Sequence, residues 1–434
     1  MLSYPYLEGY TAMRVLLQTL IEENELLLEE VKESVHRTYQ FPDSKHIQVA
    51  IGMRRAGKSY FLYQTIHALL KQSVSATQIL LINFEDDRLL PMTAKEMGKL
   101  LDMFYQIYPE NHHRRCHIFL DEIQNVEDWH LTVRRYFDKK NVQLYLTGSS
   151  AKLLSKEIHT NLRGRSQTLE IWPYSFTEYL TAHHIIIESK TLGQITLDKL
   201  QKNLLDYFAR GGFPAVQFMP LAQWRETLQH YVDTVILRDI VERYHVTHID
   251  LLKYLTTTLI KNAATIFSIN KFYNDIKSQG YKVSKDTLHT YLYYLEDAFL
   301  IFSVSHYSES ERLKHNKPKK IYAIDIGLIH AMSLSVNELY GKLFENLIYL
   351  DLRRQHKKIY YYVTQEGFEI DFITVDPSGH CECIQVCFDD SDEKTKAREN
   401  RALLAAKKEL GIEGKMITIR DYLLDFGKTG SASY

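Results

Sequence analysis

The chain has 434 residues, which is enough for about three domains of ordinary size. Its 53 basic and 54 acidic residues give a formal net charge of −1, so a surface that is basic throughout is excluded and only a local basic patch remains open. The cysteines are too few and too clustered for a disulfide framework: Cys116, Cys381, Cys383 and Cys387. No apolar run approaches the ~18 residues of a membrane span, and Met1 to Tyr6 lack the features of a signal peptide. We therefore expect a soluble protein of the reducing cytoplasm without a membrane partner.

The first predicted element is a helix. Residues Met13 to about Thr38 carry leucine, isoleucine and valine at helical spacing, with glutamates between them. The first strand follows near His46. It is an apolar-leaning run, Ile47 to Ile51, of the kind that forms a buried parallel strand.

A phosphate-binding pattern follows this strand directly. The run Gly52-Met53-Arg54-Arg55-Ala56-Gly57-Lys58-Ser59 fits G-x-x-x-x-G-K-[S/T] without a gap, and an amphipathic helix to Lys71 comes next. In such a loop the backbone N–H groups and the helix N-terminus face nucleotide phosphates. Lys58 adds positive charge near the β and γ phosphates, and Ser59 offers a hydroxyl to Mg²⁺. The residues expected to contact the nucleotide are Gly52, Arg54, Arg55, Ala56, Gly57, Lys58, Ser59 and Tyr60.

Two acids end a later strand. Gln78 to Phe84 form one continuous apolar strand, and His117 to Leu120 form another that ends in Asp121 and Glu122. Asp121 would hold Mg²⁺ through water, and Glu122 is placed to polarise the water that attacks the γ-phosphate. The alternative is a structural role for both acids, which a preceding P-loop makes the minority interpretation. Given this site, the N-terminal helix either closes over the base of the nucleotide or is an ordinary packing helix.

A fourth strand, Val142 to Leu146, ends in Thr147-Gly148-Ser149-Ser150. Parallel sheets place ligand groups at the carboxyl ends of their strands, so Thr147 or Ser149 is a candidate sensor of the γ-phosphate. Arg163 and Arg165 follow, and either could reach a γ-phosphate in its own or a neighbouring subunit, the latter requiring a homo-oligomer. Helix capping or pairing with surface acids is the alternative. The alternation of strands and helices predicts an α/β fold with a doubly wound parallel sheet.

These runs, together with Leu162-Arg163-Gly164-Arg165, Pro173 to Leu180, Gly211-Gly212-Phe213-Pro214 and Arg238-Asp239-Ile240, resemble a family. It is that of the AAA+-type P-loop ATPases of bacteria and archaea whose C-terminal half is a domain of unknown function. The resemblance implies that the cofactors are ATP and Mg²⁺. It also implies hydrolysis with Lys58, Ser59, Asp121 and Glu122 in their usual roles, and it implies no particular cellular task.

From Asp250 the pattern changes to three helices and a hairpin, which resembles a winged helix. Ser284 is a good N-cap for a second helix that Leu288 to Phe299 continue. The wing would be Leu300 to Tyr307 and Lys320 to Ile324, joined by a loop that carries Arg312, Lys314, Lys317 and Lys319. In one interpretation the helix face with Lys285, His289 and Thr290 enters a DNA major groove while the loop contacts phosphates. In the other, the module packs against the ATPase or another subunit.

The last part, from about Leu339, reads as helix, three strands, helix and strand, and resembles the restriction-endonuclease fold. The elements are Leu339 to Arg354, Lys358 to Val363, Phe368 to Val375, Cys381 to Phe388, Glu393 to Leu410 and Lys415 to Ile419. The resemblance makes Glu345 the helix acid and Asp371 the metal-binding aspartate. The expected E-x-K pair falls on Gln385 and Cys387, which supply neither a negative ligand nor a fixed positive charge.

We therefore predict a nuclease-like domain without nuclease activity. Cys381, Cys383 and Cys387 share one strand face, but zinc usually takes cysteines from turns at C-x-x-C spacing, so a zinc site is disfavoured.

The expected domains are residues 1–182 for the N-terminal helix and the ATPase, 183–334 for a helical connector and the winged helix, and 335–434 for the nuclease-like domain. The expected function is ATP hydrolysis coupled to motion of the C-terminal modules, with DNA as a candidate partner. The alternative is an ATP-gated switch or adaptor that binds a protein or DNA with little turnover.

Overall fold

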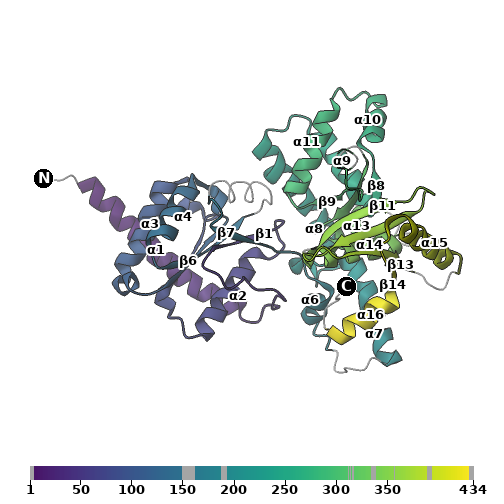
Figure 1. Ribbon diagram of the computed structural model, residues 1–434. Helices are drawn as coiled ribbons and strands as arrows, with labels where there is room; N and C mark the ends of the chain where they lie inside the picture. Colours follow the sequence, from purple (N-terminus) through teal and green to yellow (C-terminus); the bar gives the residue numbers. More distant parts are fainter. Residues whose placement is uncertain are drawn as a thin grey trace. The chain divides into compact units, whose positions relative to one another are not determined.

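The structure is a computed structural model that describes residues 4–148, 162–186, 193–310, 312, 314, 317–333, 339–355, 357–388 and 393–429. The chain divides into two compact units, residues 1–172 and 173–434, and each is described by itself (Figure 1). The first unit ends at Trp172. The division into three domains stays a prediction. None of the described helices is long and apolar enough to cross a membrane.

The first unit is built on a five-stranded parallel sheet with the strand order β2-β4-β6-β1-β7. Its strands are β1 (Ile47–Ile51), β2 (Ile79–Asn83), β4 (Cys116–Asp121), β6 (Val142–Gly148) and β7 (Ser166–Glu170). Its helices are α1 (Tyr4–Val31), α2 (Lys58–Lys71), α3 (Ala94–Ile107) and α4 (Trp129–Lys139). A small sheet pairs β3 (Met92–Thr93) with β5 (Val126–Glu127). The predicted doubly wound α/β sheet is confirmed.

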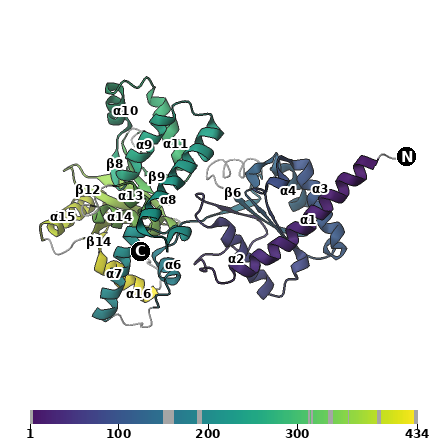
Figure 2. The same ribbon diagram turned by 180° about the vertical axis from the view of Figure 1, so that it is seen from behind.

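Helices cover this sheet because its central strands are apolar on both sides. All six residues of β4 are buried. On one face α1 and α2 pack on a core that includes Leu62, Leu81 and Phe119 (Figure 2). The N-terminal helix differs from its expected range: α1 begins at Tyr4 and ends at Val31, and the chain to His46 is irregular.

The second unit begins with helices and continues into a small antiparallel sheet. The helices are α6 (Phe176–Ala182), α7 (Gln194–Arg210) and α8 (Leu221–Thr234), and α8 continues as the π-helical segment η6 (Val235–Glu242). Next come α9 (Ile249–Lys261), β8 (Thr265–Phe267), α10 (Ile269–Ser278), α11 (Lys285–Asp297), β9 (Ile301–Val304) and β10 (Lys319–Ala323). The sheet order is β8-β10-β9, antiparallel throughout. The predicted three helices and hairpin are present, and β8 is an additional strand that was not predicted. The winged-helix assignment stays a prediction.

The remainder of the second unit contains a four-stranded sheet. Its elements are α13 (Ile326–Met332), α14 (Tyr340–Arg354), β11 (Lys358–Val363), β12 (Glu369–Val375), β13 (Cys381–Cys387), α15 (Glu393–Leu410), β14 (Gly414–Thr418) and α16 (Ile419–Thr429). The order is β11-β12-β13-β14, and only β13 and β14 run parallel. The predicted sequence of helix, three strands, helix and strand is present, and α16 is additional.

A buried aspartate joins distant segments of this unit. Asp325 accepts hydrogen bonds from the backbone N–H groups of Gly212, at 2.6 Å, and Gly327, at 2.8 Å. A Cβ at Gly211 would lie 2.2 Å from Asp325 Oδ1, so the backbone approach is too close for any side chain there. The glycine pair Gly211-Gly212 therefore makes a packing contact between α7 and the start of α13.

Candidate active site

The predicted nucleotide-binding residues meet at one edge of the five-stranded sheet. The P-loop follows β1, Asp121 ends β4, and Thr147 lies near the end of β6. The register of β4 and β6 aligns Leu120 with Leu146, so Asp121 and Thr147 are neighbours across the sheet. Because these strands are parallel, their carboxyl ends form one edge, as the sequence predicted.

Close packing and left-handed backbone conformations shape the P-loop. A Cβ on Gly52 would lie 2.2 Å from the carbonyl oxygen of Ile171, so only glycine fits there. Gly57 has a φ of 100° and begins α2, while Arg55 has a φ of 70° and is exposed. Tyr60 is 52% exposed and its ring lies beside that of Tyr63. The N-terminus of α2 therefore points into the loop, as a phosphate site requires.

Lys58 and Glu122 form a buried ion pair at this edge. The two side chains are 4% and 8% exposed, and Lys58 Nζ lies 3.4 Å from Glu122 Oε1. The same ammonium donates to the carbonyl oxygens of Gly52 and Met53, at 3.2 and 3.4 Å. Burial alone would raise the pKa of Glu122, but Lys58, a hydrogen bond from Gln124 and the charge of Arg54 outweigh it and lower that pKa. Glu122 is therefore ionised and able to accept a proton.

Asp121 has one satisfied and one unsatisfied oxygen. Thr147 Oγ1 donates to Asp121 Oδ1, and Thr147 Oγ1 also accepts the backbone N–H of Glu122 at 2.9 Å. Asp121 Oδ2 is buried and has no hydrogen-bond partner among the described residues, although the Ser59 hydroxyl is close enough to lower the pKa of this carboxyl. Burial and the neighbouring charge of Glu122 raise that pKa more. A buried carboxylate oxygen without a donor, next to a hydroxyl, fits a site for Mg²⁺.

Two further contacts support the loop, and the sequence did not indicate either. Arg54 pairs with Glu85, beyond the end of β2, at 2.8 Å. Arg37 donates to the carbonyl oxygen of Ala56 at 2.6 Å and to that of Trp172 at 2.5 Å. Arg37 lies in the irregular segment after α1, where no motif marks it.

The two candidate arginines lie elsewhere. Arg163 is exposed in the turn before β7, and Arg165 precedes β7 directly and pairs with Asp138 at 3.0 Å. Since Ile47 donates to the Arg165 carbonyl oxygen and begins β1, both arginines lie at the amino edge of the sheet, opposite the P-loop. This geometry places them away from the phosphate site of their own chain. Ser149, the other candidate sensor, lies outside the described residues.

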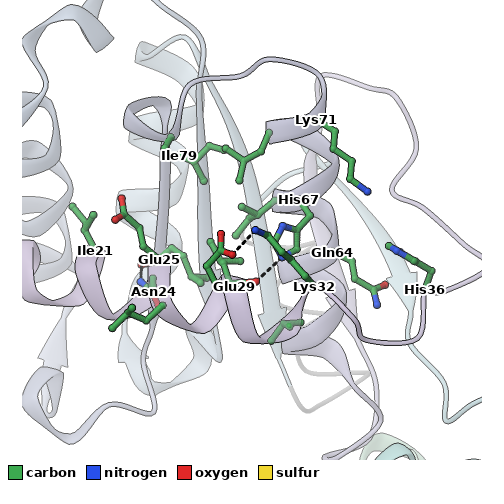
Figure 3. A pocket seen from close by; sticks show the side chains of 17 residues that line it. Ile21, Asn24, Glu25, Glu29, Lys32, His36, Gln64, His67, Lys71 and Ile79 are labelled. Atoms are coloured by element: carbon green, nitrogen blue, oxygen red, sulfur yellow. Dashed lines mark hydrogen bonds and ion pairs between the residues drawn. The ribbon is translucent and has the colours of Figure 1, made fainter.

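A cavity of about 840 Å³ also lies in the first unit, between α1 and α2 (Figure 3). Its wall on α2 runs from Gln64 to Lys71, which is the second half of that helix. His67 crosses to α1, where its Nε2 lies 2.8 Å from the carbonyl oxygen of Leu28. The cavity is therefore separate from the P-loop, which lies at the other end of α2.

The four-stranded sheet β11-β12-β13-β14, called the nuclease-like sheet below, and α14 bring together the residues expected from the restriction-endonuclease resemblance. Gln385 and Cys387 stand where that fold has an acid and a lysine. Glu345 and Asp371 both face the ammonium of Lys320, at 2.7 and 2.9 Å. Gln385 is buried; its Oε1 accepts the N–H of Asp371, and its Nε2 donates to Glu399 at 2.6 Å. The cysteines of β13 are free thiols, and no group of three or more His, Cys, Asp or Glu side chains is placed to hold a metal in the described part of the chain.

The outer face of α11 is exposed at Lys285, His289 and Thr290. Lys285 lies over the ring of Tyr273, 5.4 Å from its centroid. Of the basic wing loop, Arg312, Lys314 and Lys317 are described, and Lys314 lies 5.7 Å from the ring centroid of Tyr360. Lys319 instead donates to Ser303.

Three stretches of the chain match models of known protein families. Residues 44–180 match an AAA domain, 201–339 a domain of unknown function (DUF8612) and 340–427 another domain of unknown function (DUF4143). The uncharacterised protein MJ1544 of Methanocaldococcus jannaschii is 35% identical over 382 residues, which is 86% of this chain and 82% of that protein. An uncharacterised protein of Haemophilus influenzae is 29% identical over 316 residues, covering 73% and 76% of the two chains.

Solved structures similar to the chain are more distant. The Walker-type ATPase Paby2304 of Pyrococcus abyssi is 14% identical with a TM-score of 0.41, covering 66% of this chain and 91% of that one. The Aeropyrum pernix Orc1 protein, solved in complex with DNA, is 11% identical with a TM-score of 0.30, covering 73% and 91%.

Proposed function

Because the chain belongs to the family in which an AAA domain precedes the domain of unknown function DUF4143, we propose that it binds ATP with Mg²⁺ and hydrolyses the γ-phosphate bond. The observation that supports this most directly is the unsatisfied buried oxygen of Asp121 beside Glu122, which forms an ion pair with Lys58 of the P-loop. The Asp121 oxygen can bind a cation, and the Glu122 carboxylate, at the same buried edge of the sheet, can act as a base.

Each residue of the proposed site has a separate role in ATP binding and hydrolysis. The N–H groups of the loop from Gly52 to Lys58 and the N-terminus of α2 hold the phosphates. Lys58 moves from Glu122 toward the β and γ phosphates, which leaves the carboxylate of Glu122 to orient and deprotonate water. Ser59 and Asp121 would hold Mg²⁺, which supplies positive charge for the transferred phosphoryl group. Thr147 keeps Asp121 and the backbone of Glu122 in register.

We test this with steady-state ATP hydrolysis and nucleotide binding for the wild type, Lys58→Ala and Glu122→Gln. Glu122→Gln should retain ATP binding and lose about 10²- to 10⁴-fold in turnover, because only the base is removed. Lys58→Ala should lose binding as well. Turnover that Glu122→Gln leaves unchanged would refute the role of Glu122 and favour a nucleotide-gated switch.

The exposed face of α11 and the basic wing support DNA as the partner to which hydrolysis is coupled. Lysines that contact phosphates release counterions, so binding must weaken steeply with salt. We expect Lys285→Gln and Lys317→Gln each to lower the salt slope by about one, and Lys342→Gln, on α14, to leave it unchanged. DNA binding with the same slope in all three variants would assign the module to a protein partner.

Arg165 pairs with Asp138, whereas Arg163 is exposed. We propose that Arg163 acts on the site of a neighbouring subunit, which would make an oligomer the hydrolytic form. An exposed arginine remote from its own phosphate site can act only on the site of a neighbouring subunit. Hydrolysis per chain should then rise with protein concentration in the wild type and lose that dependence in Arg163→Ala. Turnover that is independent of concentration in the wild type would exclude the role in a neighbouring subunit.

A further inference from the structure

Three carboxylates in the nuclease-like sheet converge on one buried amine. Glu345 of α14, with Glu369 and Asp371 of β12, place an oxygen 2.7, 2.6 and 2.9 Å from Lys320 Nζ. The side chain of Lys320 is 1% exposed, and those of Glu345 and Asp371 are 14% and 11% exposed. Glu369 is 40% exposed and stays partly solvated. Removing the other two carboxylates from water is costly unless a cation lies between them.

The amine comes from the other sheet of the second unit. Lys320 lies on β10, the strand shared by β8 and β9, and not on any strand of the four-stranded sheet. Alternation along β10 turns Lys319 to the opposite side, where it contacts Ser303, and places Tyr322 on the same side as Lys320. Tyr322 donates its hydroxyl to Glu345 at 2.7 Å. One strand of the wing therefore supplies both the charge and a hydrogen bond to the cluster.

The other contacts of the cluster do not supply a second positive charge that reaches all three carboxylates. Asp371 Oδ2 accepts the backbone N–H of Val386 at 3.0 Å, and both ends of the Gln385 amide are used by other partners. Arg398 is nearby but pairs with Glu399. Burial alone would lower the pKa of Lys320, but Asp371, Glu345 and Glu369 outweigh it and raise that pKa, so the amine is charged. Lys320 is thus the cation that touches all three carboxylates.

We propose that the Lys320 ammonium is a covalently attached substitute for a divalent metal ion. With Lys320 in place the cluster is not a metal site. The ammonium takes the position at which Glu345, Glu369 and Asp371 would bind Mg²⁺ or Mn²⁺ if the lysine were removed, and it fastens the wing strand β10 to the four-stranded sheet. In the native chain this sheet is therefore a metal-independent structural and binding module. The inference does not depend on ATP hydrolysis, since it concerns a different part of the chain.

The test is chemical denaturation of the full chain and Mn²⁺ titration, each for the wild type, Lys320→Met and Lys319→Met. Lys320→Met keeps most of the side-chain volume and removes the charge, and Lys319→Met makes the same change on the opposite face of β10. We expect Lys320→Met to lose stability, to regain it with Mn²⁺, and to bind Mn²⁺ at least ~10-fold more tightly than the wild type. Lys319→Met should behave as the wild type in both measurements.

One further variant shows whether Mn²⁺ binds at this cluster or at Asp121 of the P-loop site. Another distinguishes the effect of the lost charge from the effect of changed packing. Lys320→Met/Asp371→Asn should lose the Mn²⁺ response, which assigns that response to this cluster and not to Asp121. If Lys320→Met alone does not fold, Lys320→Met/Glu345→Gln/Asp371→Asn removes most of the uncompensated charge and should fold. Any of three results would overturn the proposal: Asp371-dependent Mn²⁺ binding that is equally tight in the wild type, unchanged stability of Lys320→Met, or a triple variant no more stable than Lys320→Met.

Discussion

Thr147 shows how one hydroxyl can set the geometry of two acids. It donates to Asp121 Oδ1 and accepts the N–H of Glu122, which has a left-handed φ of 51°. A non-glycine residue in that conformation is held there by its surroundings. Thr147 or Ser149 was predicted as a phosphate sensor, and this stays a prediction. In the structure the Thr147 hydroxyl contacts Asp121 and the backbone of Glu122, so we expect it to position the proposed metal ligand and base.

Thr147→Val should therefore lower the rate of hydrolysis and the stability of the first unit together. The substitution leaves the Glu122 N–H without an acceptor, which costs about 1–3 kcal/mol, while Thr147→Ser keeps the hydroxyl. The readouts are kcat and denaturant unfolding. Wild-type kcat in Thr147→Val would show that Asp121 and Glu122 hold their positions without this residue.

Gly52 is a second residue whose role follows from distance alone. Gly52→Ala would place a Cβ 2.2 Å from the Ile171 carbonyl oxygen, and backbone on both sides leaves little room to move. We expect the first unit to lose about 1–3 kcal/mol from overpacking, together with weaker nucleotide binding. The matched control is Gly341→Ala on α14, where a Cβ meets nothing within 4 Å. Equal stability of the two variants would mean that the loop and β7 separate easily.

The sequence predicted the residues of the site that lie in one motif or at one strand end, and missed those supplied from a distance. Lys58, Asp121 and Glu122 could be placed because a parallel sheet brings its carboxyl ends together. Arg37 lies in an irregular segment without periodicity. Lys320 was predicted at the start of a wing strand, directly after a lysine-rich loop, and only the structure shows that it points inward to three carboxylates.

At the scale of elements, the stability of the contact between α7 and α13 depends on whether the Asp325 carboxyl is protonated. Complete burial raises the pKa of this carboxyl from 3.8 to about 6, and the N–H groups of Gly212 and Gly327 offset only part of that increase. The folded chain therefore holds the proton more tightly than the unfolded chain. This contribution to stability is fully present below about pH 4 and is lost as the pH rises through about 6.

We accordingly expect the Asp325 carboxyl to make the second unit about 1 kcal/mol more stable at pH 5 than at pH 7. Asp325→Asn removes the titration, so the difference between the wild type and this variant isolates the contribution of Asp325 from those of the other titratable groups of the unit. Denaturant unfolding at the two pH values provides the measurement. Parallel pH profiles for the two proteins would show that Asp325 does not titrate in this range.

Element boundaries followed the sequence where amphipathic or apolar runs are long. β11 and α15 have the predicted ends, whereas β8, with three residues, is too short to show alternation. α1 was predicted from Met13 because its first turns lack an apolar stripe. α16 was missed because it follows β14 without a turn residue.

At the scale of the whole molecule, the chain consists of two compact units, and the proposed nucleotide site belongs entirely to the first. A ligand that binds only the folded form of a unit stabilises that unit, by about 2.7 kcal/mol at a hundredfold excess over Kd. We expect calorimetry to show two transitions, of which MgATP raises one. Lys58→Ala should abolish that shift and leave the other transition in place. A shift of both transitions would indicate that the units unfold together.

Arg37 gives this arrangement a mechanical consequence. Its guanidinium holds the carbonyl oxygen of Ala56 in the P-loop and that of Trp172, the last residue of the first unit. It connects the P-loop to the residue that precedes Pro173. Displacement of the loop must either break one of these two hydrogen bonds or pull on the covalent chain where the second unit begins. Arg37, from a segment that carries no motif, therefore links the P-loop to the residue after which the second unit begins.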